Sequence, residues 1–278
     1  MDEFHYRIAH RATSAHPGHH RSRTQGGGFE FHGHVSLSAG ADPRHIDIRA
    51  SLANPFGAYQ VRQFYQTSII PVHVIADLSV SMKLGHKTRL LSQLSAAVAY
   101  SAYRTGDPFG FIGIADQDTP SVFYPLRRYR GAALALTQRL DQQAFRGTGL
   151  ARTPCLTAWL GKGRSLIFLL SDFHFPLAHL HNLLQQLQTH DVVPVVLWLS
   201  QEWQPPARWG WLPLHDPESG IRRIKWLHPK TGKSLKRAFD QRRQQLTDLC
   251  RRYGRQPFFV IDTFQPDALS RYFLESCV

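Results

Sequence analysis

The chain has 278 residues, a hydrophobic content of 42% and a formal net charge of +13, values typical of a globular protein with one large domain, or with a domain and an extension. Its apolar runs, 165–170 and 192–199, are too short to cross a bilayer, and its first thirty residues are polar, so we expect neither a transmembrane span nor a signal peptide. Three widely spaced cysteines argue against a disulfide framework and favour a reducing cytoplasm.

The first 28 residues are rich in histidine and glycine and poor in apolar residues, so we expect a flexible arm over 1–28. Residues 29–70 should form an N-terminal extension, which begins with a strand over 29–38. The main domain is expected over 71–278.

From residue 71 onward, short apolar strands alternate with amphipathic helices. The elements expected are strand 72–77, helix 88–104, strands 109–115 and 122–126, helices 131–142 and 152–160, strand 165–171, helix 177–189, strand 192–199, helix 233–253, strand 258–261 and helix 267–274. Two further strands, 209–214 and 221–227, predict a β-hairpin inserted at about 203–230. This alternation predicts an α/β domain whose largely parallel sheet has helices on both faces.

Polar side chains follow the first of these strands. Asp77, Ser79 and Ser81 stand at alternate positions just beyond its end, so all three can turn toward one point. Hard oxygen ligands of this kind suit a hard cation such as Mg2+. Two further segments strengthen the pattern: Thr148 lies between flexible glycines, and a second buried strand is followed by Asp172.

Together these residues resemble, in order and approximate spacing, the metal-ion-dependent adhesion site of von Willebrand factor A-like domains. The resemblance implies a doubly wound, mostly parallel six-stranded sheet with one antiparallel edge strand. It implies a site for Mg2+ or Mn2+ whose ligands, direct or through water, are Asp77, Ser79, Ser81, Thr148 and Asp172. The serines would bind directly and the two acids mainly through water, and Thr153 is the alternative to Thr148.

The segment upstream carries a second resemblance. Residues 40–51, Gly-Ala-Asp-Pro-Arg-His-Ile-Asp-Ile-Arg-Ala-Ser, resemble the G-D-D-x-R-x-I-D-W motif of the MoxR-associated von Willebrand factor A-like family, domain of unknown function 58. Residues 216–220 resemble the D-x-E-T-G turn of that family. Ala41 and Ile48 depart from the motif, replacing its first acid and its tryptophan.

The family resemblance implies a bacterial, non-enzymatic adaptor or co-chaperone of a MoxR-type AAA+ ATPase, active in protein maturation or metal insertion. The cation would offer an open coordination position to an acidic residue of the ATPase or of a client. No general base or nucleophile is evident beside it, and a phosphoaspartyl enzyme would need an acid where Ser79 stands. We therefore expect a cytoplasmic protein that is not an enzyme and has no stable membrane insertion.

The alternative function rests on the distribution of charge. Between Arg222 and Arg255 twelve Lys or Arg face only two acidic residues, which leaves about +3 for the rest of the chain. Such a segment, with tryptophans nearby, could bind nucleic acid or a membrane surface while the metal site is structural. The same charges are equally typical of a solvated helix face, so nucleic acid is not the expected partner.

Overall fold

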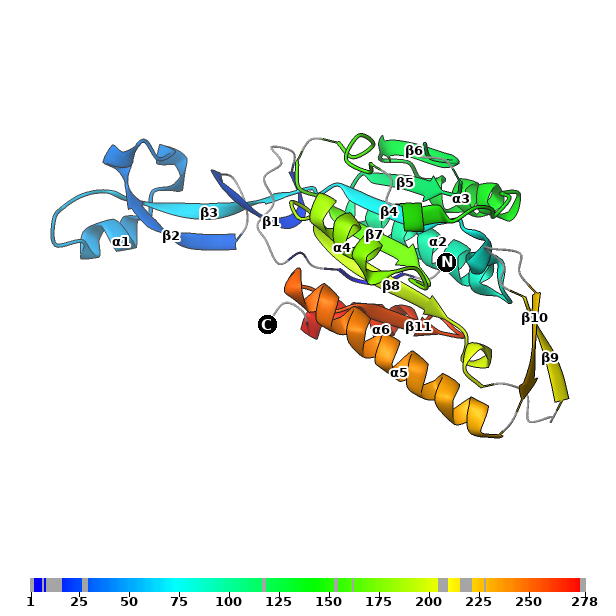
Figure 1. The fold of residues 1–278 in the computed structure, drawn as a ribbon. Coiled ribbons are helices and arrows are strands. Elements are labelled where there is room, and N and C mark those ends of the chain that lie inside the picture. Colours follow the sequence, from blue (N-terminus) through cyan, green and yellow to red (C-terminus); the bar gives the residue numbers. More distant parts are fainter. Residues whose placement is uncertain are drawn as a thin grey trace. The chain divides into compact units, whose positions relative to one another are not determined.

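The computed structural model describes residues 3–6, 8, 17–26, 30–116, 119–152, 155–161, 163–204, 210–215, 222–227 and 229–275 (Figure 1). The chain divides into two compact units. One consists of Met1–Arg7 together with Pro71–Val278, and the other of Ile8–Ile70. The short segment at the start of the chain thus belongs to the larger unit.

Six strands form the sheet of the larger unit (Figure 1). In sheet order they are β11 (Phe258–Ile261), β8 (Asp191–Trp198), β7 (Leu166–Ser171), β4 (Val72–Asp77), β5 (Phe109–Ile114) and β6 (Val122–Arg127). All neighbours pair in parallel except β5 and β6. The strand order reverses between β4 and β7, as in a doubly wound fold. The predicted α/β class, with its one antiparallel edge strand, is confirmed and has the von Willebrand factor A-like arrangement.

Helices cover both faces of this sheet, which explains why every residue of β4, β5, β7 and β8 is buried. On one face, side chains of α4 (Leu177–Gln186) and α5 (Pro229–Arg252) join a core cluster with Ile75 and Ile167. On the other face, Phe168 contacts Phe273 of α6 (Pro266–Glu275). The long helix α2 (Lys87–Thr105) packs with α3 (Ala132–Asp141).

The first described residues pack into this second face. Phe4 and Tyr6 are buried, and the ring of Phe4 stacks on Phe273 at 6.4 Å and meets Phe168 edge-on at 5.8 Å. The Tyr6 hydroxyl donates a hydrogen bond of 2.5 Å to Asp107. The expectation of a flexible arm over 1–28 is therefore wrong for these residues, because two aromatic side chains among polar neighbours give no periodic signal but fill a core.

The smaller unit contains a three-stranded antiparallel sheet in the order β1 (Pro17–Gly26), β3 (Gln60–Ser68), β2 (Glu30–Ser36). The strand β1 also lies within the expected arm, and this second part of that expectation is wrong because β1 pairs with β3. Between β2 and β3 the chain forms the 3-10 helices η1 (Leu37–Ala39) and η2 (Pro43–His45) and the helix α1 (Ile48–Ala53). Asp47 caps α1 by accepting from the Ala50 N–H, and it also binds Arg62 at 2.7 Å and His34 at 3.1 Å.

Most expected elements of the larger unit are present, with one exception. The helix expected over 152–160 is wrong: the 3-10 helix η4 (Gly149–Arg152) is followed by turns in the described part of that stretch. Leu156 and Leu160, four residues apart, suggested a helical face, but both are buried in the core from irregular chain. The expected hairpin is formed by β9 (Gly210–His215) and β10 (Arg222–Leu227), which pair antiparallel.

No helix among the described residues combines the length and the apolar character needed to cross a bilayer.

His73 gives the larger unit a dependence on pH. Its ring is buried in β4, and burial, together with the charge of His190, lowers its pKa from 6.5 to about 4. As the pH falls below 6.5, His73 becomes protonated in the unfolded chain but stays neutral in the folded one. The free energy of unfolding at pH 5 is therefore lower by about 2 kcal/mol than at a pH well above 6.5.

We expect His73→Leu to lose less stability than the parent chain when the pH is lowered from 8 to 5, because this side chain cannot titrate. Chemical unfolding at the two pH values measures the difference. Equal losses in the two proteins would contradict the assignment of this titration to His73.

Candidate functional site

The carboxyl ends of β4 and β7 lie side by side and bring two acidic side chains together in the protein interior. Asp77 and Asp172 are each only 1% exposed. The carboxylate of Asp77 accepts a hydrogen bond from the Ser171 hydroxyl at 2.7 Å and from the Ser79 N–H at 3.0 Å. Burial, aided by the charge of Asp172, raises the pKa of Asp77 to about 7. The edge of the sheet therefore holds a carboxylate whose charge is poorly compensated.

Two serine hydroxyls complete this side of the site. Ser79 precedes the 3-10 helix η3 (Val80–Lys83), and Ser81 lies within it. Their Oγ atoms are 3.0 Å apart, and both side chains are buried. The hydroxyl of Ser81 also hydrogen-bonds to Asp172. The spacing of the motif thus brings its hydroxyls to the same place as the two acids.

A loop between α3 and η4 runs alongside this turn and carries Thr148. The Arg146 N–H donates to the Leu78 carbonyl at 3.0 Å, and the Gly147 carbonyl accepts from the Val80 N–H at 3.2 Å. These bonds fasten the loop to the segment after β4, with Thr148 half-buried. The alternative, Thr153, lies outside the described residues.

Gly149 forms the closest part of that loop. Its φ is +53°, and a Cβ atom at this position would lie 1.9 Å from Oδ1 of Asp77. No side chain fits there without moving the carboxylate. The backbone is thus shaped around Asp77 itself.

A buried lysine also belongs to the site. The side chain of Lys87, at the start of α2, is completely buried, and its Nζ lies 2.9 Å from Oδ2 of Asp172 and 2.9 Å from Oε1 of Glu202. Glu202 ends the 3-10 helix η5 (Ser200–Glu202) and also bonds to His174 at 2.9 Å. Burial alone would raise the pKa of Asp172, but the charges of Lys87 and His174 and the hydrogen bonds from Lys87 and Ser81 together outweigh burial and hold that pKa below its usual value.

Sequence reasoning did not predict the roles of Lys87, Glu202 and Ser171. A lone lysine in the first turn of a helix has the same pattern as a solvated one, and burial of its charge depends on contacts far along the chain. Glu202 offers a weak signal, since it is the sole acid between Asp191 and Asp216. Ser171 directly precedes Asp172 and lies at the end of a buried strand.

The loop after β7 is held by side chains from neighbouring elements. The Trp198 indole N–H donates to the Asp172 carbonyl at 2.8 Å. Arg242 of α5 donates to the carbonyls of Phe173, at 2.6 Å, and of Phe175. Phe173 has a φ of +50°, which is rare for such a residue and requires this kind of support. The position of Asp172 is thus fixed from both sheet and helix.

The chemistry of these groups fits a hard divalent cation. Hydroxyl and carboxylate oxygens surround the edge of the sheet, and the two bonds named at Asp77 come from uncharged donors, whereas Lys87 is shared by Asp172 and Glu202. Within the described ranges, no group of three or more His, Cys, Asp or Glu side chains is arranged to hold a metal.

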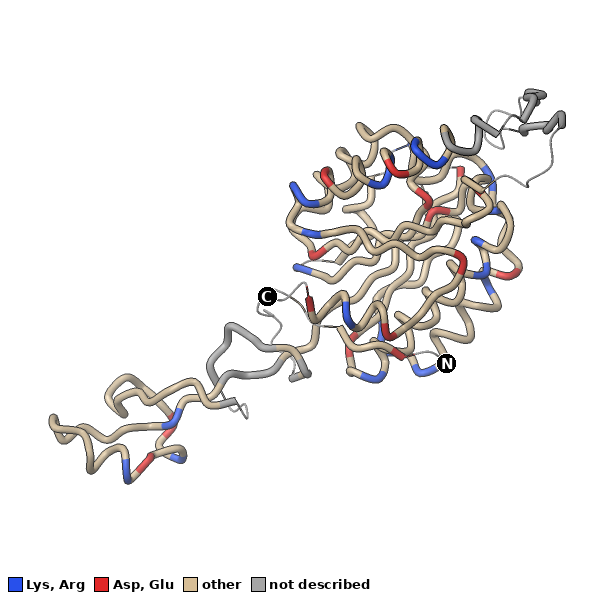
Figure 2. The backbone as a smooth tube through the Cα atoms, turned by 90° about the horizontal axis from the view of Figure 1, so that it is seen from below, with Lys and Arg blue, Asp and Glu red and all other residues tan. Residues whose placement is uncertain are grey.

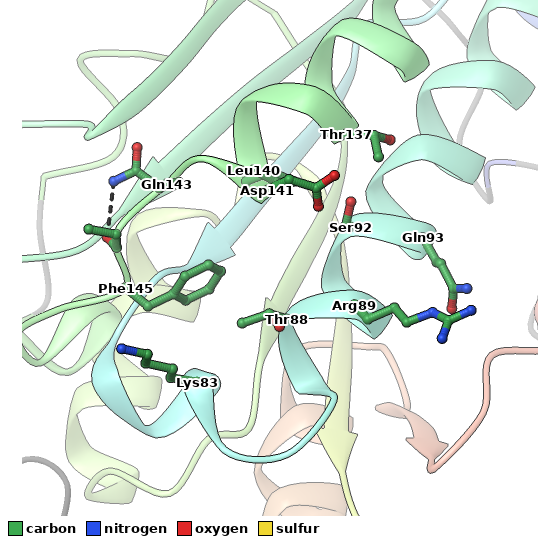
Figure 3. A pocket seen from close by; sticks show the side chains of 11 residues that line it. Lys83, Thr88, Arg89, Ser92, Gln93, Thr137, Leu140, Asp141, Gln143 and Phe145 are labelled. Atoms are coloured by element: carbon green, nitrogen blue, oxygen red, sulfur yellow. Dashed lines mark hydrogen bonds between the residues drawn. The ribbon is translucent and has the colours of Figure 1, made fainter.

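A shallow cavity of about 640 Å3 adjoins this region between α2 and α3 (Figure 3). Lys83 of η3 and Phe145 line one side, and Thr88, Arg89 and Ser92 of α2 line another. Lys83 is two residues from Ser81 in the sequence.

The family model described as "Protein of unknown function DUF58" matches residues 38–245, which is most of the chain. The chain belongs to the DUF58 family. No curated protein matches it significantly. The predicted membership of DUF58 is confirmed, and the matched range spans the upstream motif, β4 and β7.

Solved structures provide more distant similarities to this DUF58 protein. The conserved hypothetical protein BatB from Bacteroides thetaiotaomicron is 12% identical, with a TM-score of 0.42, over 74% of this chain and 98% of its own. An aerotolerance-related membrane protein from Bacteroides fragilis is 11% identical, with a TM-score of 0.38, over 75% and 98%. A von Willebrand factor type A protein from Catenulispora acidiphila is 16% identical, with a TM-score of 0.34, over 76% and 43%.

The close approach of the Gly149 backbone to the carboxylate of Asp77 predicts a strict requirement for glycine at position 149. We expect Gly149→Ala to lower the free energy of unfolding by about 2 kcal/mol or more, through the contact with Asp77 and the positive φ. Gly161→Ala is the matched control, because a Cβ there meets nothing within 4 Å. Urea unfolding of both variants measures the two free energies. Similar free energies of unfolding for Gly149→Ala and Gly161→Ala would contradict the requirement for glycine at position 149.

Proposed function

We propose that this DUF58 protein binds Mg2+ or Mn2+ at the carboxyl edge of its sheet and uses the ion to capture an acidic residue of another protein. The proposed direct ligands are Ser79, Ser81 and Thr148, with Asp77 and Asp172 acting mainly through bound water. The observation that carries the proposal is the burial of Asp77 beside Asp172, with two serine hydroxyls at the same place. When bound, the ion would supply one open coordination position for a carboxylate.

The protein's own groups would prepare this capture. Ser171 and the Ser79 N–H orient Asp77, and Lys87 orients Asp172. Because the acids are buried, they cannot rotate to leave the hydroxyls, so the set of oxygens is preorganised. These groups are suited to binding rather than to hydrolysis, and we propose a non-enzymatic role.

For the partner, we propose a MoxR-type AAA+ ATPase or a client protein presented to it, with the complex in the bacterial cytoplasm. The support is membership of the DUF58 family, together with the resemblance of residues 40–51 to the motif of its MoxR-associated members. In this role the protein would act as an adaptor in protein maturation or metal insertion. The cavity beside Lys83 would then receive the residues next to the captured acid.

The basic segment favours this function over nucleic-acid binding. Two of its described arginines are engaged within the protein: Arg242 binds the carbonyls of the loop after β7, and Arg243 lies 4.6 Å from the ring centre of Phe259. Figure 2 shows Lys and Arg positions spread over many elements, with Asp and Glu positions among them. The part of the basic segment between residues 222 and 233 has side chains outside the described set.

Cation binding should stabilise the folded protein. We expect Mg2+ to raise the unfolding free energy by about 2.7 kcal/mol at a hundredfold excess over its dissociation constant, and EDTA to reverse the gain. Asp77→Ala should abolish the gain, whereas Asp240→Ala, at an exposed acid of α5, should keep it. Thermal unfolding with and without the ion measures this, and an equal gain in Asp77→Ala would contradict the site.

Partner capture should depend on the same ion. In a pull-down from the source cell, we expect a AAA+ ATPase, alone or together with its client, to bind the intact protein in Mg2+ and to be lost in EDTA or with Asp77→Ala. Asp240→Ala again serves as the matched control. The adaptor role is contradicted if no AAA+ ATPase is recovered under any condition.

A further inference from the structure

The charge of Lys87 is placed where neither solvent nor a partner can reach it. Its side chain has no exposed surface, and its Nζ lies 2.9 Å from an oxygen of Asp172 and 2.9 Å from an oxygen of Glu202. Removing an ammonium group from water is unfavourable, and the two close carboxylates offset this cost. The lysine is therefore an internal counter-ion of the site and cannot itself hold the carboxylate of another protein.

The formal charges of four side chains, Asp77, Asp172, Glu202 and Lys87, can be counted as one set. Arg242, which donates to the carbonyls of the loop after Asp172, is the same in every variant below and is left out of the count. Asp77, Asp172 and Glu202 contribute three negative charges when ionised, and Lys87 contributes one positive charge. The set with its lysine therefore carries −2, and without the lysine it would carry −3. A divalent cation brings the first set to zero and leaves the second at −1, which would repel an incoming carboxylate.

We propose that Lys87 sets the cation affinity of the site, weakening the binding of Mg2+ so that the loaded site is neutral and open to a partner's carboxylate. This inference rests on the function proposed above and adds its regulation. The ion is attracted by the negative charge of the set, so each unit of charge removed or added should change its affinity in a known direction. Lys87 acts here through Asp172 and Glu202, as a positioning residue.

Four proteins test the charge balance. Lys87→Met changes the formal charge of the set from −2 to −3, Glu202→Gln changes it to −1, and the double variant Lys87→Met with Glu202→Gln restores −2. We expect the dissociation constant for Mg2+ to fall by at least about tenfold in Lys87→Met, to rise by about tenfold in Glu202→Gln, and to stay within about threefold of the parent value in the double variant.

Titration calorimetry with MgCl2 alone measures these constants, and far-ultraviolet circular dichroism checks folding. The matched control is Lys236→Met, because Lys236 is an exposed lysine of α5 outside the proposed site and its loss should change the constant less than threefold. If Lys87→Met does not fold, Glu202→Gln and the double variant still give the order of affinities, since the double variant leaves fewer unpaired charges.

The results separate this inference from the proposed function. Weaker or equal binding in Lys87→Met, or a double variant that binds like Glu202→Gln, overturns the role of Lys87 while the cation site stands. Binding in Lys87→Met but none in the parent supports the role of Lys87 and overturns the proposed function. If none of the proteins binds Mg2+, both are overturned.

Discussion

Burial of acidic side chains where β4 and β7 end is the constraint on which the rest of the site depends. A parallel sheet covered on both faces brings the carboxyl ends of its central strands together without water. The acids placed there need partners from the chain or from an ion, since an isolated buried charge is too costly. Three parts of the chain supply such contacts. Ser171 donates to Asp77, Lys87 pairs with Asp172, and the backbone of Gly149 packs closely against Asp77.

The sheet and the core of the site could be predicted from the sequence because both depend on local patterns. Runs of Val, Ile and Leu mark the buried strands, and alternation after the first strand marks the hydroxyl motif. The arrangement of β4 and β7 as neighbours was implied by the resemblance to von Willebrand factor A-like domains, and the pairing of the two strands agrees with it. Thr148 was found by its glycines, and the structure fastens its loop beside the motif.

The rest depends on contacts between distant residues, which a local pattern does not record. Lys87 is buried only because Asp172 and Glu202 meet it from two other elements. Phe4 and Tyr6 lack neighbours that would mark them as core, and their partners lie about 100 residues or more along the chain. The error at 152–160 has the opposite cause, since helical spacing of leucines was present without a helix.

The motif upstream of the main domain has a structural explanation within its own unit. Asp42 caps η2 by accepting from the Arg44 N–H, and Asp47 caps α1 and pairs with Arg62. The two aspartates of the motif thus help to hold the turn between β2 and β3 in place. The departures at Ala41 and Ile48 fall on positions that the structure leaves partly or largely exposed, which is compatible with this turn.

The stacking of Phe4 on Phe273 joins residues that lie far apart in the sequence. Phe4 is synthesised well before Phe273, so its ring lacks this partner until the chain has passed α6. Contacts of such long sequence separation form slowly. This part of the core is therefore completed late in folding, after the strands and helices between the two residues have been made.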